Sequence, residues 1–271
     1  MYPFIHIGSF ALPTYGLMLW VAVVCAAFLL DRAFKRAGID ADAAGMVAVA
    51  AFAGVVGSKI WYLVLDAPSD IRVLGWSALW QRSGFSWFGA LASGILALVL
   101  QGWRAKIGGL RTLDLAAPAT AVGQGLGRIG CFLSGDGCYG IAIKPLHIFG
   151  FTFHPWGWAF PHGIVPVFVP VYPTPLYELA TGLLIGGWLW WRLGKPHATG
   201  AIMGQYLILA GIARFFIEFI RRNPKVLWGL SNEQLTCAGA VVLGVALLCW
   251  AARRPALKPE KTPRKQVAKP A

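Results

Sequence analysis

Six charged residues interrupt otherwise apolar stretches of the sequence, and their types and spacing could do chemistry. They are Lys59, Asp114, Arg128, Glu178, Arg214 and Glu218. A charge inside a membrane-spanning segment is costly and by default marks a functional site. Guanidinium groups bind phosphate oxygens in a two-pronged geometry, so the arginines predict a site for a phosphate group. More basic residues follow directly in the sequence RRNPK, namely Arg221, Arg222 and Lys225.

A second interpretation is that these arginines and carboxylates only pair with one another and lock helices together. Arg214 and Glu218 are four residues apart, hence on one face of a helix, and are the best candidates for such a pair. For the set as a whole, three basic residues face only two carboxylates near one end of the spans. That excess of positive charge favours phosphate binding.

The composition indicates that lipid surrounds most of these residues. Of the 271 residues, 57% are hydrophobic and only 13% are charged, against about 25% charged in soluble domains. Crossing a bilayer takes about 20 mostly apolar residues, and seven stretches qualify: 12–30, 44–65, 84–103, 113–133, 175–193, 200–220 and 234–252. We therefore expect an all-α, polytopic membrane protein with seven transmembrane helices, because the strand alternation of a barrel is absent.

The distribution of the net charge of +13 predicts topology and argues against nucleic-acid binding. If seven spans alternate, Arg32, Arg104 and Arg192 fall on one side of the membrane together with the basic C-terminal tail. By the positive-inside rule that side is the cytoplasm, which places the N-terminus outside and the C-terminus inside. All of the six charges except Asp114 then lie near the outer leaflet.

The rest of the sequence predicts one transmembrane domain, connecting segments outside the membrane and a C-terminal tail. Residues 1–252 are expected to form a single transmembrane domain, with an irregular outer loop region at about 134–174 in which VPVFVPV could form a short strand. Residues 66–86 are expected to hold a short interfacial helix. The tail at 253–271 is rich in Lys and Pro and is expected to be disordered in the cytoplasm.

Other sites can be weighed from the same residues. Gly125, Gly127 and Gly130 spell the dinucleotide-binding pattern G-x-G-x-x-G, but no strand is predicted before them, so close helix packing is the better interpretation. Cys131 and Cys138 could form a disulfide or stay free. The histidines of the outer loop lack metal-ligand spacing, so neither a metal nor a cofactor is expected.

Six motifs follow one another along the chain: LPTYGLM (12–18), GSKIWY (57–62), GFSWFGALASG (84–94), GLGRIGCFLSGDGCYG (125–140), PTPLYE (173–178) and ARFFIEFIRRNP (213–224). With these motifs the chain resembles the bacterial prolipoprotein diacylglyceryl transferases over nearly its whole length. The resemblance implies a multi-pass enzyme of the cytoplasmic (inner) membrane whose active site faces the outer leaflet. It also implies transfer of diacylglycerol from phosphatidylglycerol to the lipobox cysteine of a prolipoprotein signal peptide, with release of glycerol phosphate.

The resemblance also implies roles for individual residues. It makes Arg128, Arg214 and Glu218 catalytic. Together with the charge pattern, it predicts that phosphatidylglycerol is bound by Tyr15, Lys59, Gly127, Arg128, Gly130, Ser134, Asp136, Glu178 and Arg221. The expected partners are phosphatidylglycerol, prolipoprotein signal peptides and membrane lipids, with no nucleic acid and no cofactor.

This chain departs from the family pattern at several positions. Phe88 and Tyr172 stand where the family has histidines, Cys131 and Ser134 where it has asparagines, Asp136 where it has a glutamate, and Lys59 where it has an arginine. Activation of the thiol by a histidine is therefore not implied, although the field of the arginines could lower the pKa of the thiol. The alternative function is that of a non-catalytic or differently specific protein that binds or transports phospholipid.

Overall fold

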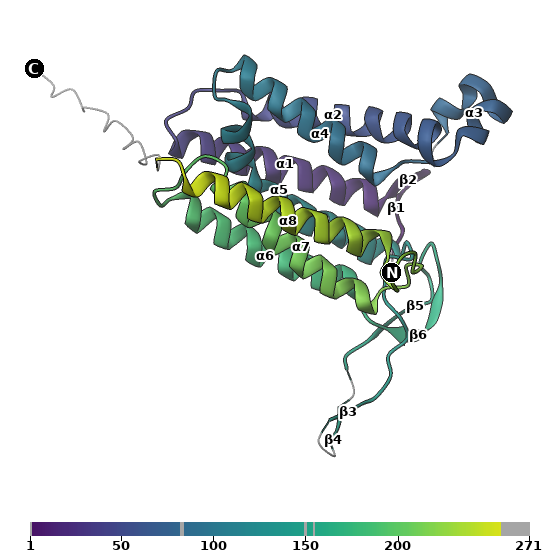
Figure 1. Cartoon of the computed structure of the whole chain (residues 1–271). Coiled ribbons are helices and arrows are strands. Elements are labelled where there is room, and N and C mark those ends of the chain that lie inside the picture. Colours follow the sequence, from purple (N-terminus) through teal and green to yellow (C-terminus); the bar gives the residue numbers. More distant parts are fainter. Residues whose placement is uncertain (1, 82–83, 149–150, 154, 256–271) are drawn as a thin grey trace, which may run out of the picture. The chain divides into compact units, whose positions relative to one another are not determined.

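The computed structural model describes residues 2–81, 84–148, 151–153 and 155–255, most of which lie in helices (Figure 1). The chain divides into two compact units. The first combines Met1–Ala26 with Ala117–Leu257, and the second contains Ala27–Ala116. Helices α1 (Thr14–Arg36) and α5 (Gly109–Ser134) continue from one unit into the other. Residues 256–271, most of the predicted tail, lie outside the described residues.

The first unit is a helical bundle with short strands at its connections. It contains the hairpin β1 (Phe4–Ile7) and β2 (Phe10–Pro13), the helices α6 (Thr174–Leu193), α7 (Ala201–Ile217) and α8 (Asn232–Ala252), and the 3-10 turn η3 (Glu218–Ile220). The connection from α5 to α6 holds the antiparallel pairs β3 (Leu146–Ile148) with β4 (Phe151–Phe153) and β5 (Trp158–Phe160) with β6 (Val167–Val171). Strand β6 confirms the strand expected in VPVFVPV.

The second unit pairs α2 (Ala43–Trp61) with α4 (Trp87–Arg104). The two backbones come close, because a Cβ added to Gly89 would lie 2.5 Å from the carbonyl oxygen of Gly57. Between them the chain forms the π-helical turn η1 (Tyr62–Asp66), the helix α3 (Pro68–Leu74) and the 3-10 helix η2 (Gly75–Trp80). Helical structure was expected in this segment, and its Trp76 and Trp80 are exposed.

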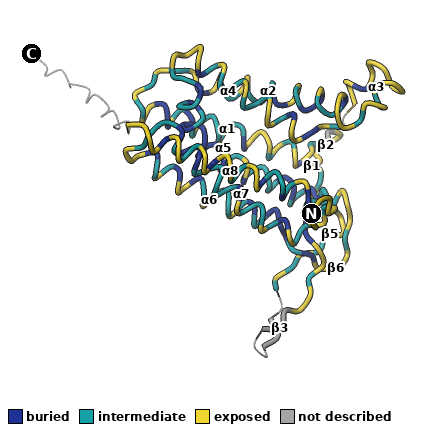
Figure 2. Tube along the Cα trace, in the orientation of Figure 1, coloured by how far each residue is buried: buried dark blue, intermediate teal, exposed yellow. Residues whose placement is uncertain are grey.

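A helix of 17 or more residues occupies each of the seven stretches predicted to span the membrane. Among the described residues, four segments are long and apolar enough to cross a bilayer: Thr14–Arg36, Ala43–Asp66, Ala201–Ile220 and Asn232–Ala252. Exposed residues occur all along the helices (Figure 2). Many of them are large and apolar, such as Trp20, Phe52 and Leu184. A water-soluble protein seldom exposes so many of them, so the chain is a membrane protein, while seven crossings and their orientation stay predictions.

Apart from β6, the sequence pattern did not predict the short strands of the described residues. The hairpin β1–β2 precedes α1 in a stretch where we expected the first span to begin at residue 12. Its turn contains Gly8, which has a φ of +62° that glycine adopts without strain. The expected span at 12–30 therefore overlaps the end of β2 and then coincides with α1.

Helix α6 lies against α5 through glycines. A Cβ on Gly182 would lie 2.8 Å from the carbonyl oxygen of Ala121 and 3.0 Å from the Cα of Gly125. Such close approach is the usual role of small residues in packed membrane helices. Gly125 therefore serves helix packing inside α5 and not a nucleotide-binding turn, as the sequence led us to expect.

Because the two helices approach closely at only one of two glycines of α6, alanine should affect stability differently at each. We expect Gly182→Ala to destabilise the protein by about 1–3 kcal/mol through overpacking. Gly187→Ala should instead stabilise it by about 0.5–1 kcal/mol, since nothing lies within 4 Å of the added Cβ and alanine favours the helix. Thermal unfolding in detergent micelles measures both variants. Equal shifts of the same sign would contradict the packing described.

Candidate active site

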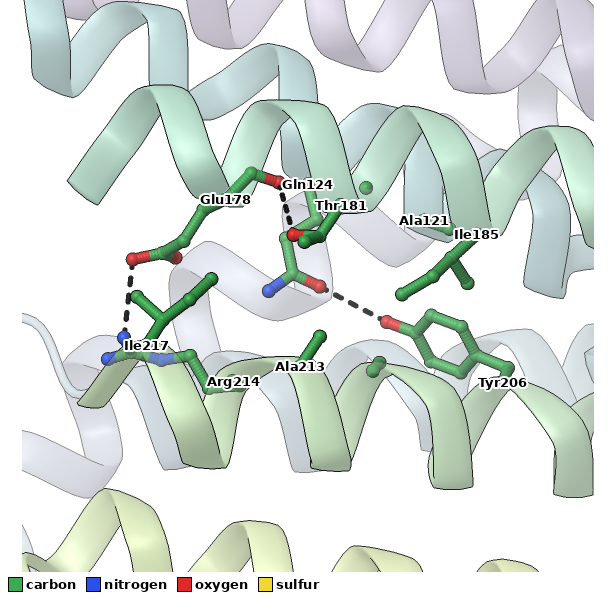
Figure 3. A pocket seen from close by; sticks show the side chains of 11 residues that line it. Ala121, Gln124, Glu178, Thr181, Ile185, Tyr206, Ala213, Arg214 and Ile217 are labelled. Atoms are coloured by element: carbon green, nitrogen blue, oxygen red, sulfur yellow. Dashed lines mark hydrogen bonds and ion pairs between the residues drawn. The ribbon is translucent and has the colours of Figure 1, made fainter. Parts of the chain in front are cut away.

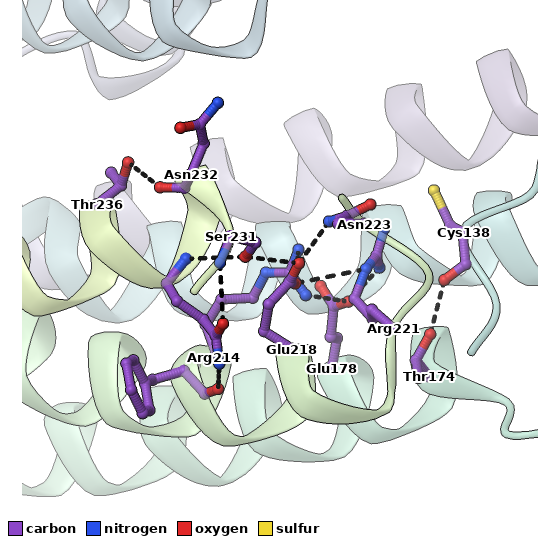
Figure 4. Close-up of polar contacts among 12 residues, drawn as sticks. Cys138, Thr174, Glu178, Arg214, Glu218, Arg221, Asn223, Ser231, Asn232 and Thr236 are labelled. Carbon is purple, nitrogen blue, oxygen red and sulfur yellow. Dashed lines mark hydrogen bonds and ion pairs between the residues drawn. The ribbon is translucent and has the colours of Figure 1, made fainter. Parts of the chain in front are cut away.

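Five charged side chains of the first unit lie close together, and Figure 4 shows four of them, namely Glu178, Arg214, Glu218 and Arg221. Arg128 comes from α5, Glu178 from α6, Arg214 from α7, Glu218 from η3, and Arg221 from the loop that follows. Each helix was expected from the apolar pattern of its residues, and Pro175 in the first turn of α6 fixes where that helix starts. The convergence itself is a tertiary feature.

Glu178 is the centre of this cluster and contacts all three arginines. Its Oε2 lies 2.8 Å from Nε of Arg128. Its Oε1 lies 3.2 Å from Nη1 of Arg214 and 2.9 Å from Nη1 of Arg221. The Glu178 side chain is only 5% exposed, and a carboxylate at such a depth is tolerated only when it is paired in this way.

Glu218 is the second carboxylate, and it is fully buried. Its Oε2 lies 2.9 Å from Nη2 of Arg214 and 3.6 Å from Nε of Arg221. Its Oε1 accepts hydrogen bonds from the amide of Asn223 and from the hydroxyl of Ser231, the latter at 3.1 Å. The predicted pairing of Arg214 with Glu218 along one helix face is confirmed.

The cluster presents positive charge to its surroundings. Three guanidinium groups and two carboxylates leave one net positive charge. The side chains of Arg128 and Arg214 are each 19% exposed, whereas those of Glu178 and Glu218 are 5% and 0% exposed. The carboxylates therefore orient the arginines from behind, and an incoming anion would meet the guanidinium groups first. The pairing that we considered as an alternative is present, and it is compatible with anion binding.

A pocket opens beside this cluster between α5, α6 and α7 (Figure 3). Glu178 and Arg214 lie at one end of it, and Tyr206 lies at the other. The Tyr206 hydroxyl donates a hydrogen bond of 3.2 Å to Oε1 of Gln124. Apolar side chains such as Ile185 complete the lining. A few polar groups in an apolar pocket are typical of a binding site for a ligand with both characters.

The last turn of α5 and the loop that follows bring Cys131, Ser134, Asp136 and Cys138 together. Ser134 is fully buried, and its hydroxyl donates to the carbonyl oxygen of Cys131 at 3.3 Å. Oδ1 of Asp136 accepts a hydrogen bond of 3.0 Å from the backbone N–H of Cys138. Both cysteines are free thiols in the structure. A hydrogen bond from the Cys131 thiol lowers the pKa of the Cys138 thiol, although burial acts in the opposite direction.

The remaining predicted residues are placed as follows. Tyr15 is half-exposed and packs on Gly130, where an added Cβ would lie 3.2 Å from the Cα of Tyr15. A Cβ added to Gly127 would meet no atom of the other described elements within 4 Å, so the helix surface is open there. Lys59 belongs to the second unit, where Nζ donates to the carbonyl oxygen of Gln81 at 3.1 Å.

The sequence reasoning missed the polar residues that support the cluster. Ser231 begins α8 with a capping box, in which its hydroxyl and the side chain of Gln234 satisfy backbone N–H groups reciprocally. The spacing of SNEQ is the signature of such a box and could have been found. By contrast, the contacts of Asn223 and of the pair Gln124–Tyr206 depend on the fold.

We expect Ser231→Ala to destabilise the protein by about 1–2 kcal/mol, because it removes both the helix cap and a hydrogen bond to buried Glu218. Thr236→Ala is the matched control on the same helix, since that exposed hydroxyl only bonds the carbonyl oxygen of Asn232. It should change stability by less than about 0.5 kcal/mol. Denaturant unfolding followed by tryptophan fluorescence makes the comparison. The assigned role of Ser231 is wrong if both variants unfold at the same midpoint.

The fold and the site define a mainly helical membrane protein with three arginines paired to two buried carboxylates. The model of the family "Prolipoprotein diacylglyceryl transferase" matches residues 3–250, and the chain therefore belongs to this transferase family. Two relatives named phosphatidylglycerol–prolipoprotein diacylglyceryl transferase, from Clostridium tetani and Chromohalobacter salexigens, are each 30% identical to it. The first alignment covers 85% of this chain and 90% of the relative, and the second covers 93% and 92%.

Proposed function

We propose that this protein transfers the diacylglyceryl group of phosphatidylglycerol to the lipobox cysteine thiol of prolipoproteins and releases glycerol phosphate. The single observation that supports this most is the cluster of Arg128, Arg214 and Arg221 around two buried carboxylates. Membership of the family and the names of its relatives supply the substrates. The partners are phosphatidylglycerol in the membrane and a signal peptide that crosses it.

In this reaction the thiol sulfur attacks the glyceryl carbon that bears the phosphate. A carbon–sulfur bond forms, the carbon–oxygen bond breaks, the electron pair leaves on the phosphate of glycerol phosphate, and the proton of the thiol is released to water. Arg128 and Arg214 are proposed to stabilise this leaving group, whose charge increases as the bond breaks. Glu218 positions Arg214, and Glu178 holds all three arginines in place before the lipid arrives.

The other predicted residues are proposed to bind the lipid. Arg221 adds a third guanidinium group, and the open surface at Gly127 lets a headgroup approach the helix beside Arg128. The proposed headgroup contacts also include Tyr15, Gly130, Ser134 and Asp136. For Lys59, which belongs to the second unit, a lipid contact stays a prediction from the sequence. The pocket between Arg214 and Tyr206 suits the glyceryl part of the lipid, because polar groups mark its ends and apolar side chains line it.

The proposed setting is the inner membrane of a bacterium, with seven crossings, the N-terminus outside and the C-terminus in the cytoplasm. The basic residues after the first, third and fifth spans support this orientation. The arginine cluster then lies at the depth of the outer leaflet. Residues 1–252 would act as one transmembrane domain, with a basic cytoplasmic tail from residue 253.

Purified protein reconstituted with phosphatidylglycerol and a lipobox peptide tests the proposal. We expect the mass of the peptide to increase by one diacylglyceryl group, with an equal amount of glycerol phosphate released. A serine-for-cysteine version of the peptide is the control and should stay unmodified. If the protein binds the lipid in an arginine-dependent way and leaves the peptide unmodified, the alternative of a lipid-binding or lipid-transporting protein is correct.

A further inference from the structure

Two thiols and one carboxylate meet at the outer end of α5 beside the arginine cluster. Sγ of Cys131, Sγ of Cys138 and a carboxylate oxygen of Asp136 all lie within 4.8 Å of one another. Cys131 is buried in the last turns of α5. Gly135 and Gly137, with φ of +59° and +88°, turn the chain back so that Cys138 returns to Cys131.

We propose that Cys131, Asp136 and Cys138 bind a thiophilic divalent metal ion, with Zn²⁺ as the best match. Zinc takes thiolate and carboxylate ligands in tetrahedral sites. Bond lengths of about 2.3 Å to sulfur put two such ligand sulfurs about 3.8 Å apart. The present spacing of at most 4.8 Å therefore needs only small side-chain movements.

The surroundings of this cluster suit a metal site. Oδ1 of Asp136 is held by the backbone N–H of Cys138, which fixes the carboxylate and leaves its other oxygen for the ion. The hydroxyl of Thr174 anchors the loop to α6 through a bond of 2.6 Å to the carbonyl oxygen of Cys138. Arg128 lies one turn before Cys131 on α5. With the ion bound, two thiolates, one carboxylate and the 2+ ion give a net charge of −1. The positive charge of Arg128 compensates it.

Three protein ligands leave the fourth tetrahedral position open, as in catalytic zinc sites. A thiol that binds there is deprotonated outright. The fourth ligand would be the acceptor thiol of the peptide, which releases its proton to water and reaches the lipid as a thiolate next to Arg128. This role rests on the proposed transfer function, whereas the metal site itself does not.

Metal content of the full-length protein tests the site. Protein purified in detergent without chelator is expected to hold stoichiometric zinc by mass spectrometry, and Cys131→Ser/Cys138→Ser should lose about tenfold or more of it, since most of the ligands are gone. Cys249→Ser, in an exposed thiol far along α8, should bind as much as the unmodified protein. Co²⁺ added to stripped protein should give a sulfur-to-cobalt charge-transfer band that the double variant lacks. Equal unfolding midpoints show that the double variant is folded.

Two results would overturn the site: equal zinc and cobalt binding in the double variant, or a Cys131–Cys138 disulfide in protein isolated without reductant. The role in transfer has its own readout. Stripping zinc should lower the rate about tenfold, and adding zinc back should restore it, because the acceptor thiol depends on the metal for its charge. If removal of zinc leaves the transfer rate unchanged, zinc has no role in transfer. If the protein binds zinc but has no transfer activity, the metal site is correct and the proposed function is wrong.

Discussion

Arg128→Ala is expected to lower the rate of diacylglyceryl transfer about 10²- to 10³-fold, which is the usual cost of removing one preorganised group that stabilises developing charge. Arg128 is the only one of the three arginines that α5 supplies, and it reaches Glu178 through Nε at 2.8 Å. Its guanidinium group is held in place before substrate binds, so its loss should appear mainly in kcat. Steady-state kinetics with phosphatidylglycerol vesicles and a lipobox peptide measure the effect.

Two further variants make this result specific. Arg128→Lys keeps the positive charge and loses the two-pronged geometry, so it should recover only part of the rate. Arg222→Ala is the matched control, because Arg222 is exposed and its guanidinium only lies over the ring of Tyr139, 5.9 Å from the ring centroid. It should leave the rate unchanged. If Arg128→Ala and Arg222→Ala have the same rate, the phosphate role of Arg128 is contradicted.

Glu178→Gln is expected to destabilise the protein by about 3–5 kcal/mol, as removal of one partner from a buried ion pair usually does. In the variant, Glu218 is the only carboxylate left in the cluster to pair with the three arginines. The loss is costly because the Glu178 side chain is only 5% exposed. The repulsion among the arginines should also displace them, so the transfer rate should fall as well. Denaturant unfolding in detergent gives the change in free energy.

The control for Glu178→Gln is Asp31→Asn, which removes the same charge from an exposed pair with Lys35 on α1. Surface pairs of this kind contribute about 0.3–0.5 kcal/mol. The midpoint of Asp31→Asn should therefore stay near that of the unmodified protein. A similar midpoint for both variants would show that Glu178 is not the structural centre of the cluster.

The sequence predicts the helices well, because an apolar stretch of about 20 residues is a strong signal in a membrane protein. It also predicts the pair Arg214–Glu218, whose spacing of four residues is a local property of a helix. The position of Glu178 between Arg128, Arg214 and Arg221 could not be predicted, since it depends on how α5, α6 and α7 pack. The charge count gave only the excess of arginines.

The cluster of Cys131, Asp136 and Cys138 at the end of α5 could not be predicted from the sequence either. The order C-x₄-D-x-C is compatible with a disulfide and with free thiols, and metal-ligand spacing was absent among the histidines. Two glycines with positive φ bring Cys138 back to Cys131, and only the folded loop reveals that Asp136 joins them. A turn of this kind is set by backbone conformation, which a pattern of residue types does not specify.

The most direct test of the central claim is the modification state of a lipoprotein in a bacterium depleted of its own prolipoprotein transferase. We expect this chain to restore growth and to increase the mass of a reporter lipoprotein by one diacylglyceryl group. Arg128→Ala, present in the membrane in the same amount, should leave the reporter unmodified. An unmodified reporter in cells that contain the unaltered chain would contradict the claim.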